Sequence, residues 1–174
     1  MRGCLAPAVV ALLTSDMASR MHWALFLMIV AEISDFIDGF IARRFNQQTE
    51  IGRFIDPIAD SIYHLSVFLA FLSLGWMPAW MLFVIYARDL AVPYIRAFAR
   101  QSGKDLENRM SGKVKSATHA LAQVGVVAIA LGAFGPANGV DGVLSHGLLL
   151  AATAMSLYSL LDYALEAKRL VADK

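Results

Sequence analysis

Cysteine and charge are both scarce in this 174-residue sequence, and each scarcity excludes a class of protein. The single cysteine, Cys4, excludes an intrachain disulfide framework and a zinc site built on cysteines. Charged residues make up 17% of the chain, below the roughly 25% of an average soluble domain, while hydrophobic residues reach 58%. The net charge of +1 provides no overall field that would attract nucleic acid. This composition also argues against a large soluble domain and against a disordered chain.

Long apolar stretches recur along the chain, separated by short connectors that contain Gly, Pro, Ser or Asn. A membrane span needs about 20 apolar residues, so six spans would use about 120 of them and leave little besides loops. The stretches are Leu5–Leu13, Trp23–Ile41, Ile58–Leu74, Trp80–Phe98, Val114–Phe134 and Val143–Leu165. The first is short and begins almost at Met1. We therefore expect an all-α integral membrane protein with one domain over residues 1–174, built as a bundle of six transmembrane helices whose first helix is shortened.

Lys and Arg residues gather on one side of this expected bundle. If six helices cross, the opposite side receives only Arg20. The residues on the basic side are Arg2, Arg43, Arg44, Arg53, Arg100, Lys104, Arg109, Lys113, Lys115, Lys168, Arg169 and Lys174. Because Lys and Arg near short loops are retained in the cytoplasm, both termini are expected to be cytoplasmic.

Four aspartates lie where the second apolar stretch ends and the third begins. Asp35 and Asp38 are three residues apart and Asp56 and Asp60 are four apart, so each pair shares one face of a helix. A connector of about a dozen residues is expected to bring the two helices side by side with these faces opposed. Ionised carboxylates would repel one another there, so either some are protonated or divalent cations neutralise them. Oxygen ligands without nearby His or Cys favour Mg²⁺ or Mn²⁺.

Other interpretations of these acids remain open. One alternative is that these acids are interfacial helix caps. Another is that they form the ion pathway of a divalent-cation transporter, since charged groups in membrane helices usually mark function. Gly39 and Ala42 lie on the same helical side as Asp38 and provide either close helix packing or room for a ligand. Arg43 is placed to pair with a phosphate.

The residues from Asp35 to Asp60 read D-x2-D-G-x2-A-R-x8-G-x3-D-x3-D, with every fixed position present. This pattern resembles the signature of the CDP-alcohol phosphotransferase family. The resemblance implies a six-helix membrane fold, a homodimer, and displacement of CMP from a CDP-linked donor, usually CDP-diacylglycerol, by an alcohol hydroxyl. It also implies a multi-pass protein of the cell membrane, with its active site at the cytoplasmic face.

The same resemblance implies roles for individual residues. Two Mg²⁺ or Mn²⁺ ions are expected on Asp35, Asp38, Asp56 and Asp60, and Asp60 is also expected to act as the general base. The positions that contact the nucleotide in the family correspond here to Asp35, Gly39, Ala42, Arg43 and Gly52.

Later segments resemble the phosphatidylglycerophosphate synthases of this family. These segments are Tyr86–Asp89, Arg96, Gly112–Ser116 and Asp162–Tyr163. A helix N-terminus beside two lysines suits an anion, and hence an acceptor alcohol that carries its own phosphate. Glycerol 3-phosphate is the favoured acceptor, inositol phosphate fits as well, and serine is a further alternative. The expected acceptor-binding residues are Arg88, Arg96, Arg109, Lys113 and Lys115.

Each acceptor-site residue also has a plainer explanation. Lys113 and Lys115 fit ordinary positive-inside anchors, Arg88 and Asp89 fit a structural ion pair inside the bundle, and Arg109 fits a solvated loop residue.

The start of the chain departs from the family, whose members usually begin P-N-x-L-T-x2-R-x4-P. Only Arg2 and Pro7 match this segment, so we expect the chain to start inside the usual first helix, and a catalytically inactive scaffold is a further hypothesis. The histidines His22, His64 and His146 are not at metal-ligand spacing and receive no role.

Overall fold

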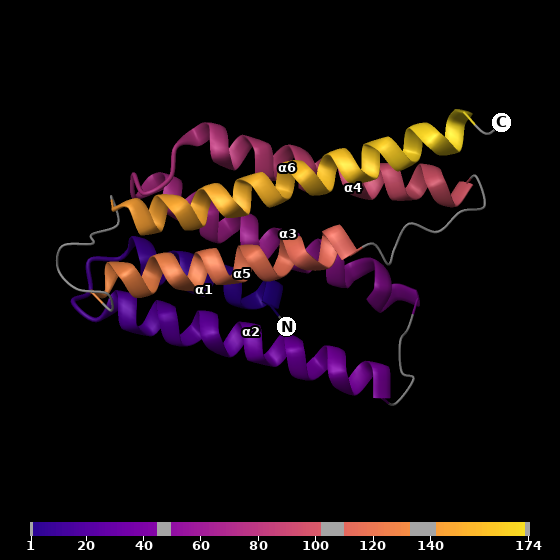
Figure 1. Ribbon diagram of the computed structural model, residues 1–174. Helices are drawn as coiled ribbons and strands as arrows, with labels where there is room; N and C mark the ends of the chain where they lie inside the picture. Colours follow the sequence, from indigo (N-terminus) through magenta and orange to yellow (C-terminus); the bar gives the residue numbers. More distant parts are fainter. Residues whose placement is uncertain (1, 45–49, 102–109, 133–141, 173–174) are drawn as a thin grey trace.

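The computed structural model describes residues 2–44, 50–101, 110–132 and 142–172, and this part of the chain is helical without strands (Figure 1). The helices are α1 (Arg2–Thr14), α2 (Arg20–Arg44), α3 (Glu50–Ser73), α4 (Ala79–Gln101), α5 (Met110–Ala130) and α6 (Val143–Ala172). The expected all-α class and the expected six helices, with a short first one, are confirmed.

The turn between α3 and α4 shows how a local sequence signal ends a helix. Gly75 has a φ of 75°, a left-handed conformation that glycine adopts without the penalty of a Cβ. The backbone N–H of Trp76 donates to the carbonyl of Phe71 at 2.9 Å, and that of Gly75 donates to Leu72 at 3.0 Å. This pair of bonds is a Schellman motif, which satisfies carbonyls left open at the end of α3. Pro78 follows two residues after Trp76, and α4 begins at the next residue.

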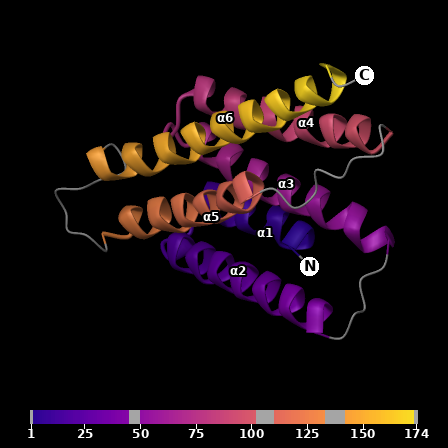
Figure 2. The same ribbon diagram turned by 45° about the vertical axis from the view of Figure 1, so that its right-hand side comes forward.

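The helices form a bundle in which α1, α3 and α5 occupy the middle (Figures 1 and 2). Helix α1 packs against α2 and α3, and α5 packs against α2, α3 and α6. Helix α4 packs against α3 and α6. Buried Ala6, Val9 and Leu13 place the short α1 inside the main apolar core. A smaller cluster of Val92, Ala99 and Tyr163 joins α4 to α6.

The expectation that α2 and α3 lie side by side is wrong for the residues that the structure describes. These two helices make no direct packing contact there, and both are contacted by α1 and α5. The physical reason is that α1 buries its apolar side chains in the space between them, which is favourable. Direct packing of two acidic faces would instead bring like charges together away from water. The aspartate-bearing helices are therefore bridged by α1 and α5 in the described part of the chain.

The segments to which the sequence analysis assigns functional residues lie at one end of the bundle. The C-terminal ends of α2, α4 and α6 and the N-terminal ends of α3 and α5 lie at this end in both ribbon views (Figures 1 and 2). The opposite end holds the turn between α1 and α2, where the Arg20 guanidinium donates to the carbonyl of Ser15. Arg20, the one basic residue expected on that side, therefore stabilises the turn between α1 and α2.

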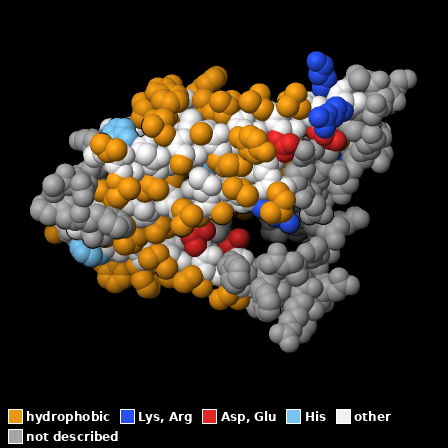
Figure 3. Space-filling model, viewed as in Figure 1, with side chains coloured by type: hydrophobic (Ala, Val, Ile, Leu, Met, Phe, Trp, Pro, Cys, Tyr) orange, Lys and Arg blue, Asp and Glu red, His pale blue; other side chains and the backbone are white. Residues whose placement is uncertain are grey.

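The surface over the bodies of the helices is apolar. Large hydrophobic side chains are exposed on every long helix, among them Phe26, Leu69, Phe83, Leu121 and Leu161. On the face shown in Figure 3, the Lys and Arg side chains lie towards the end of the bundle where α3 and α5 begin. By length and composition, one helix in the described part of the chain, Val143–Arg169, is suited to cross a membrane. The number of crossings and the side on which the termini lie remain predictions.

Candidate functional site

The aspartate motif spans the end of α2 and the beginning of α3. Asp35 and Asp38 lie in the last turns of α2, and Asp56 and Asp60 lie in the first turns of α3. Among these four side chains, the structure describes those of Asp35, which is exposed, and Asp60, which is partly buried.

The other motif side chains lie outside the described residues, as does the loop residue Arg109; those in the motif are Asp38, Gly39, Ala42, Arg43, Gly52 and Asp56. No group of three or more metal-ligand side chains occurs in the part that is described. The metal and nucleotide assignments therefore stay predictions. The donor set itself fits a hard cation, since it consists of carboxylates.

Asp60 is contacted through both of its carboxylate oxygens. The hydroxyl of Ser116 on α5 donates to Oδ2 at 3.3 Å. Nε2 of His64, one turn further along α3, lies 3.3 Å from Oδ1. The Asp60 side chain keeps 25% of its surface exposed. It is therefore contacted by Ser116 and His64 and still accessible to solvent. The sequence interpretation assigned no role to His64, although its four-residue spacing from Asp60 places both on one helix face.

A buried ion cluster joins α4 to α5. Arg88 Nη1 lies 2.8 Å from Asp89 Oδ1, and Lys115 Nζ lies 3.0 Å from the same oxygen and 3.1 Å from Oδ2. Arg88 also donates to the hydroxyl of Ser159 on α6, from Nε at 3.3 Å and from Nη2 at 3.1 Å. Two basic side chains thus share one carboxylate. Arg88 and Asp89 form the ion pair that the plainer explanation predicted, and Lys115 is buried in it instead of lying at the surface. The predicted role of Arg88 and Lys115 in binding the acceptor stays a prediction.

A second guanidinium lies at the junction of α4, α5 and α6. Arg96 Nη2 donates to the hydroxyl of Tyr163 at 2.7 Å, and its Cζ lies 5.0 Å from the centre of that ring. Arg96 Nε is buried and has no hydrogen-bond partner in the described part of the chain. A Cβ on Gly112 would come within 3.2 Å of the Tyr163 hydroxyl, 3.4 Å of Arg96 Nη2 and 3.7 Å of Arg88 Nη2. The contact with the Tyr163 hydroxyl would be tighter than usual and the other two ordinary, so glycine at this position lets the start of α5 lie close to Tyr163, beside both guanidinium groups.

The first turns of α5 connect the acidic and basic parts of the site. Ser111 donates to Asp162 at 2.6 Å, Lys115 reaches Asp89, and Ser116 reaches Asp60. Lys113, in the same segment, is exposed. Of the predicted acceptor residues, Arg88, Arg96 and Lys115 thus lie close together around the start of α5. Lys and Arg side chains are also visible towards this end of the molecule in Figure 3.

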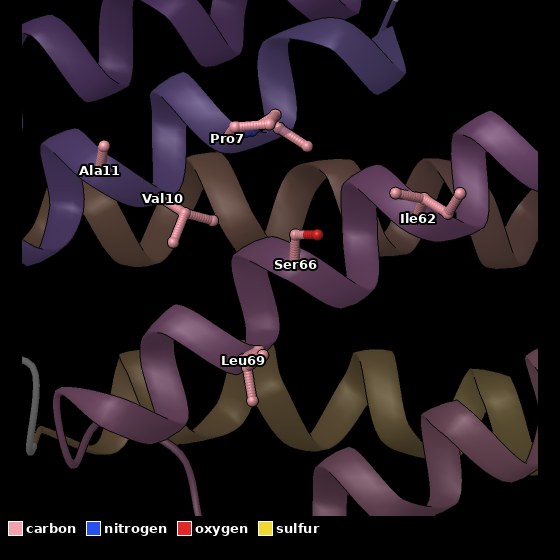
Figure 4. Close-up of a pocket in the computed structure, with 7 residues that line it drawn as sticks. Pro7, Val10, Ala11, Ile62, Ser66 and Leu69 are labelled. Atoms are coloured by element: carbon pink, nitrogen blue, oxygen red, sulfur yellow. The ribbon is translucent and has the colours of Figure 1, made fainter.

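A separate groove runs between α1 and α3 and has a volume of about 410 Å³. Pro7, Val10 and Ala11 line it from one side, and Ile62, Ser66 and Leu69 line it from the other (Figure 4). Its lining contains no charged side chain, so it lacks the groups that would bind a phosphate.

The start of α5 thus links Asp60 on α3 to the ion cluster of Arg88, Asp89 and Lys115. The family model described as CDP-alcohol phosphatidyltransferase matches residues 1–162 of this chain. The chain belongs to this family.

Similar proteins come from several bacteria. A CDP-diacylglycerol–glycerol-3-phosphate 3-phosphatidyltransferase of Bacillus subtilis is 34% identical over 90 residues, which are 52% of this chain and 47% of that protein. A probable phosphatidylglycerophosphate synthase of Mycobacterium tuberculosis is 32% identical over 147 residues, 84% of this chain and 66% of that protein. A cardiolipin synthase (CMP-forming) of Streptomyces coelicolor is 35% identical over 81 residues, 47% of this chain and 38% of that protein. The chain thus spans less than half of two of these relatives.

Proposed function

We propose that this chain is a phosphatidyltransferase that displaces CMP from CDP-diacylglycerol with the hydroxyl of glycerol 3-phosphate. The acceptor oxygen forms a bond to the lipid-linked phosphorus, the bond from that phosphorus to CMP breaks, and CMP leaves with the electron pair. The hydroxyl proton passes to Asp60. Relatives named for this reaction support the proposal.

One observation carries the proposal: the start of α5 contacts Asp60 and the basic cluster at the same time. Ser116 bonds to Asp60, and Lys115, the residue before it, bonds to Asp89 beside Arg88. A carboxylate base and a phosphate-binding cation cluster linked through one helix end suit an acceptor that carries both a hydroxyl and a phosphate.

The donor side of the reaction is assigned to the aspartate motif. Asp35, Asp38, Asp56 and Asp60 would hold two divalent cations, Mg²⁺ or Mn²⁺, and the nucleotide would lie against Gly39, Ala42, Arg43 and Gly52. When bound, such ions neutralise pyrophosphate charge and stabilise the leaving group. Asp60, held from behind by Ser116 and His64, would present its exposed edge to the acceptor hydroxyl.

Release of CMP in the presence of a panel of acceptors tests this function. We expect turnover with glycerol 3-phosphate and little with inositol phosphate or serine. Turnover with inositol phosphate alone would reassign the acceptor and keep the reaction. Cation flux into proteoliposomes without any CMP release would instead support the transporter hypothesis.

Replacing Arg96 with Gln is expected to raise the KM for glycerol 3-phosphate roughly 10- to 100-fold, since a hydrogen bond to a charged group is worth about 1.5–3 kcal/mol. The KM for CDP-diacylglycerol is expected to stay unchanged, and the measurement is initial-rate kinetics with each substrate varied in turn. Lys168→Gln is the matched control, because Lys168 is an exposed cation on α6. A larger effect of R96Q on the donor KM than on the acceptor KM would contradict the assignment.

The same proposal includes a multi-pass membrane location, cytoplasmic termini and a homodimer, the last on family resemblance. The exposed apolar side chains along all long helices support contact with lipid, since exposed apolar area on this scale marks a membrane or protein interface. In a Cys4→Ser background, a cysteine at Ser19 is expected to react with an impermeant maleimide from outside intact cells, and one at Gln101 only after lysis. Equal labelling of both positions in intact cells would contradict this topology.

A further inference from the structure

His64 is fully buried and lies between Asp60 and α5. It follows Asp60 by one helical turn, so both side chains lie on the same face of α3. Its Nε2 lies 3.3 Å from Asp60 Oδ1, within ion-pair distance, and has no hydrogen-bond partner in the described part of the chain. The position of this buried imidazole, with Nε2 next to the accessible Asp60 carboxylate, suggests that His64 acts on Asp60.

Gln123 on α5 holds the histidine at two points. Its Nε2 donates to the backbone carbonyl of His64 at 2.8 Å, and its Oε1 lies 2.8 Å from His64 Nδ1. The bond to the carbonyl sets the orientation of the amide, because only the NH₂ group can donate there. Oε1 is therefore the acceptor for Nδ1–H, and Nε2 is the ring nitrogen left to face Asp60. To donate to an ionised Asp60 as well, the ring must carry a hydrogen on both nitrogens, and it is in this form that His64 would hold the carboxylate.

Neighbouring rings restrict any other placement of the imidazole. The His119 ring lies 5.6 Å from the His64 ring at 86°, and the Tyr63 ring lies 5.4 Å away at 67°. His119 is itself held by Ser156, at 2.7 Å from Nε2. The His64 ring is thus fixed in direction by α5 and closed in by edge-to-face contacts.

We infer that Gln123 and His64 position Asp60 for its role in the proposed reaction. His64 contacts one carboxylate oxygen from α3 and Ser116 contacts the other from α5, so the carboxylate is held against rotation about its own axis. His64 is a positioning residue, since it acts through Asp60 and not on the substrate. The inference rests on the proposed function for the role of Asp60, while the geometry of the three residues stands independently.

Two substitutions of His64 separate this role from a purely structural one. The amide nitrogen of Asn reaches about as far as Nδ1, and that of Gln about as far as Nε2. H64N therefore keeps a donor for Gln123 and loses the contact with Asp60, whereas H64Q keeps a donor for Asp60 and loses the bond to Gln123.

We expect H64N to lower kcat about tenfold, with the KM of both substrates unchanged, and to weaken Mn²⁺ binding about tenfold, the lower range for loss of a group that orients a metal ligand. H64Q is expected to remain close to the wild-type protein in both quantities. Mn²⁺ binding is measured on the full-length protein without substrates, by the electron paramagnetic resonance signal of the free ion. In an Asp60→Asn background, neither His64 substitution should change Mn²⁺ binding further.

The outcomes distinguish this inference from the proposed function. H64N indistinguishable from wild type, or H64Q more impaired than H64N, overturns the positioning role even if the wild-type protein releases CMP. Absence of CMP release by the wild-type protein, with the expected order of Mn²⁺ affinities, overturns the function and leaves the positioning of Asp60 intact. S156A controls for loss of a nearby buried bond, because it removes the partner of His119 and touches neither His64 nor Asp60; it should leave Mn²⁺ binding unchanged.

Discussion

Asp60→Asn is expected to lower turnover about 1,000-fold, within the range that a general base contributes. The amide keeps the size of the side chain and still accepts from Ser116, but it cannot take the proton of the acceptor hydroxyl. CDP binding should persist, and Mn²⁺ should still bind, more weakly, to the remaining carboxylates of the motif. The measurement is CMP release in mixed micelles, accompanied by binding of CDP and Mn²⁺ to the same preparation.

Asp16→Asn is the matched control for this change. Asp16 is exposed in the turn between α1 and α2, at the end of the bundle away from the site. Its substitution should leave turnover unaltered. If Asp60→Asn retained full turnover, the assignment of Asp60 as the base would be refuted, and with it the reason for placing the acceptor beside α5.

Asp89→Ala is expected to lower the free energy of unfolding by about 3–5 kcal/mol, the usual cost of removing one partner from a buried ion pair. The Asp89 side chain is 1% exposed and is the carboxylate that Arg88 and Lys115 share. Without it, two buried cations repel each other and lack their counter-charge. Chemical denaturation in detergent, followed by a helix-sensitive signal, measures the loss.

Two further variants make this result specific. Asp89→Ala combined with Lys115→Met should recover part of the lost stability, because it also removes one of the uncompensated cations. Glu166→Ala breaks an ion pair of 3.5 Å with Arg169, whose side chain is 78% exposed. Because surface pairs contribute about 0–1 kcal/mol, this control should change stability little. A loss of similar size for Asp89→Ala and Glu166→Ala would mean that the buried cluster is not a principal stabilising feature.

The sequence was sufficient for the class of fold and for the family. Each of the six apolar stretches corresponds to one of the six helices, although α3 begins at Glu50, well before its stretch, and α6 continues to Ala172, beyond the end of its stretch. The motif from Asp35 to Asp60 is local in the chain, so its spacing alone placed the aspartates at the end of one helix and the start of the next. Hydrophobic periodicity and helix-ending residues such as Gly and Pro can be recognised from the sequence alone, because both depend on neighbours within a few residues.

Which side chains meet across helices was decided by tertiary packing. The sequence favoured direct pairing of α2 and α3, but α1 and α5 contact both, and no short-range pattern encodes which helix fills the space between two others. The same holds for the pairing of Lys115 with Asp89, 26 residues apart, and for His64 with Gln123, 59 residues apart. A lysine beside a helix end and a histidine in an apolar stretch each suit several surroundings, and only the packed bundle selects one, because a buried polar group must find its partner wherever the fold brings it.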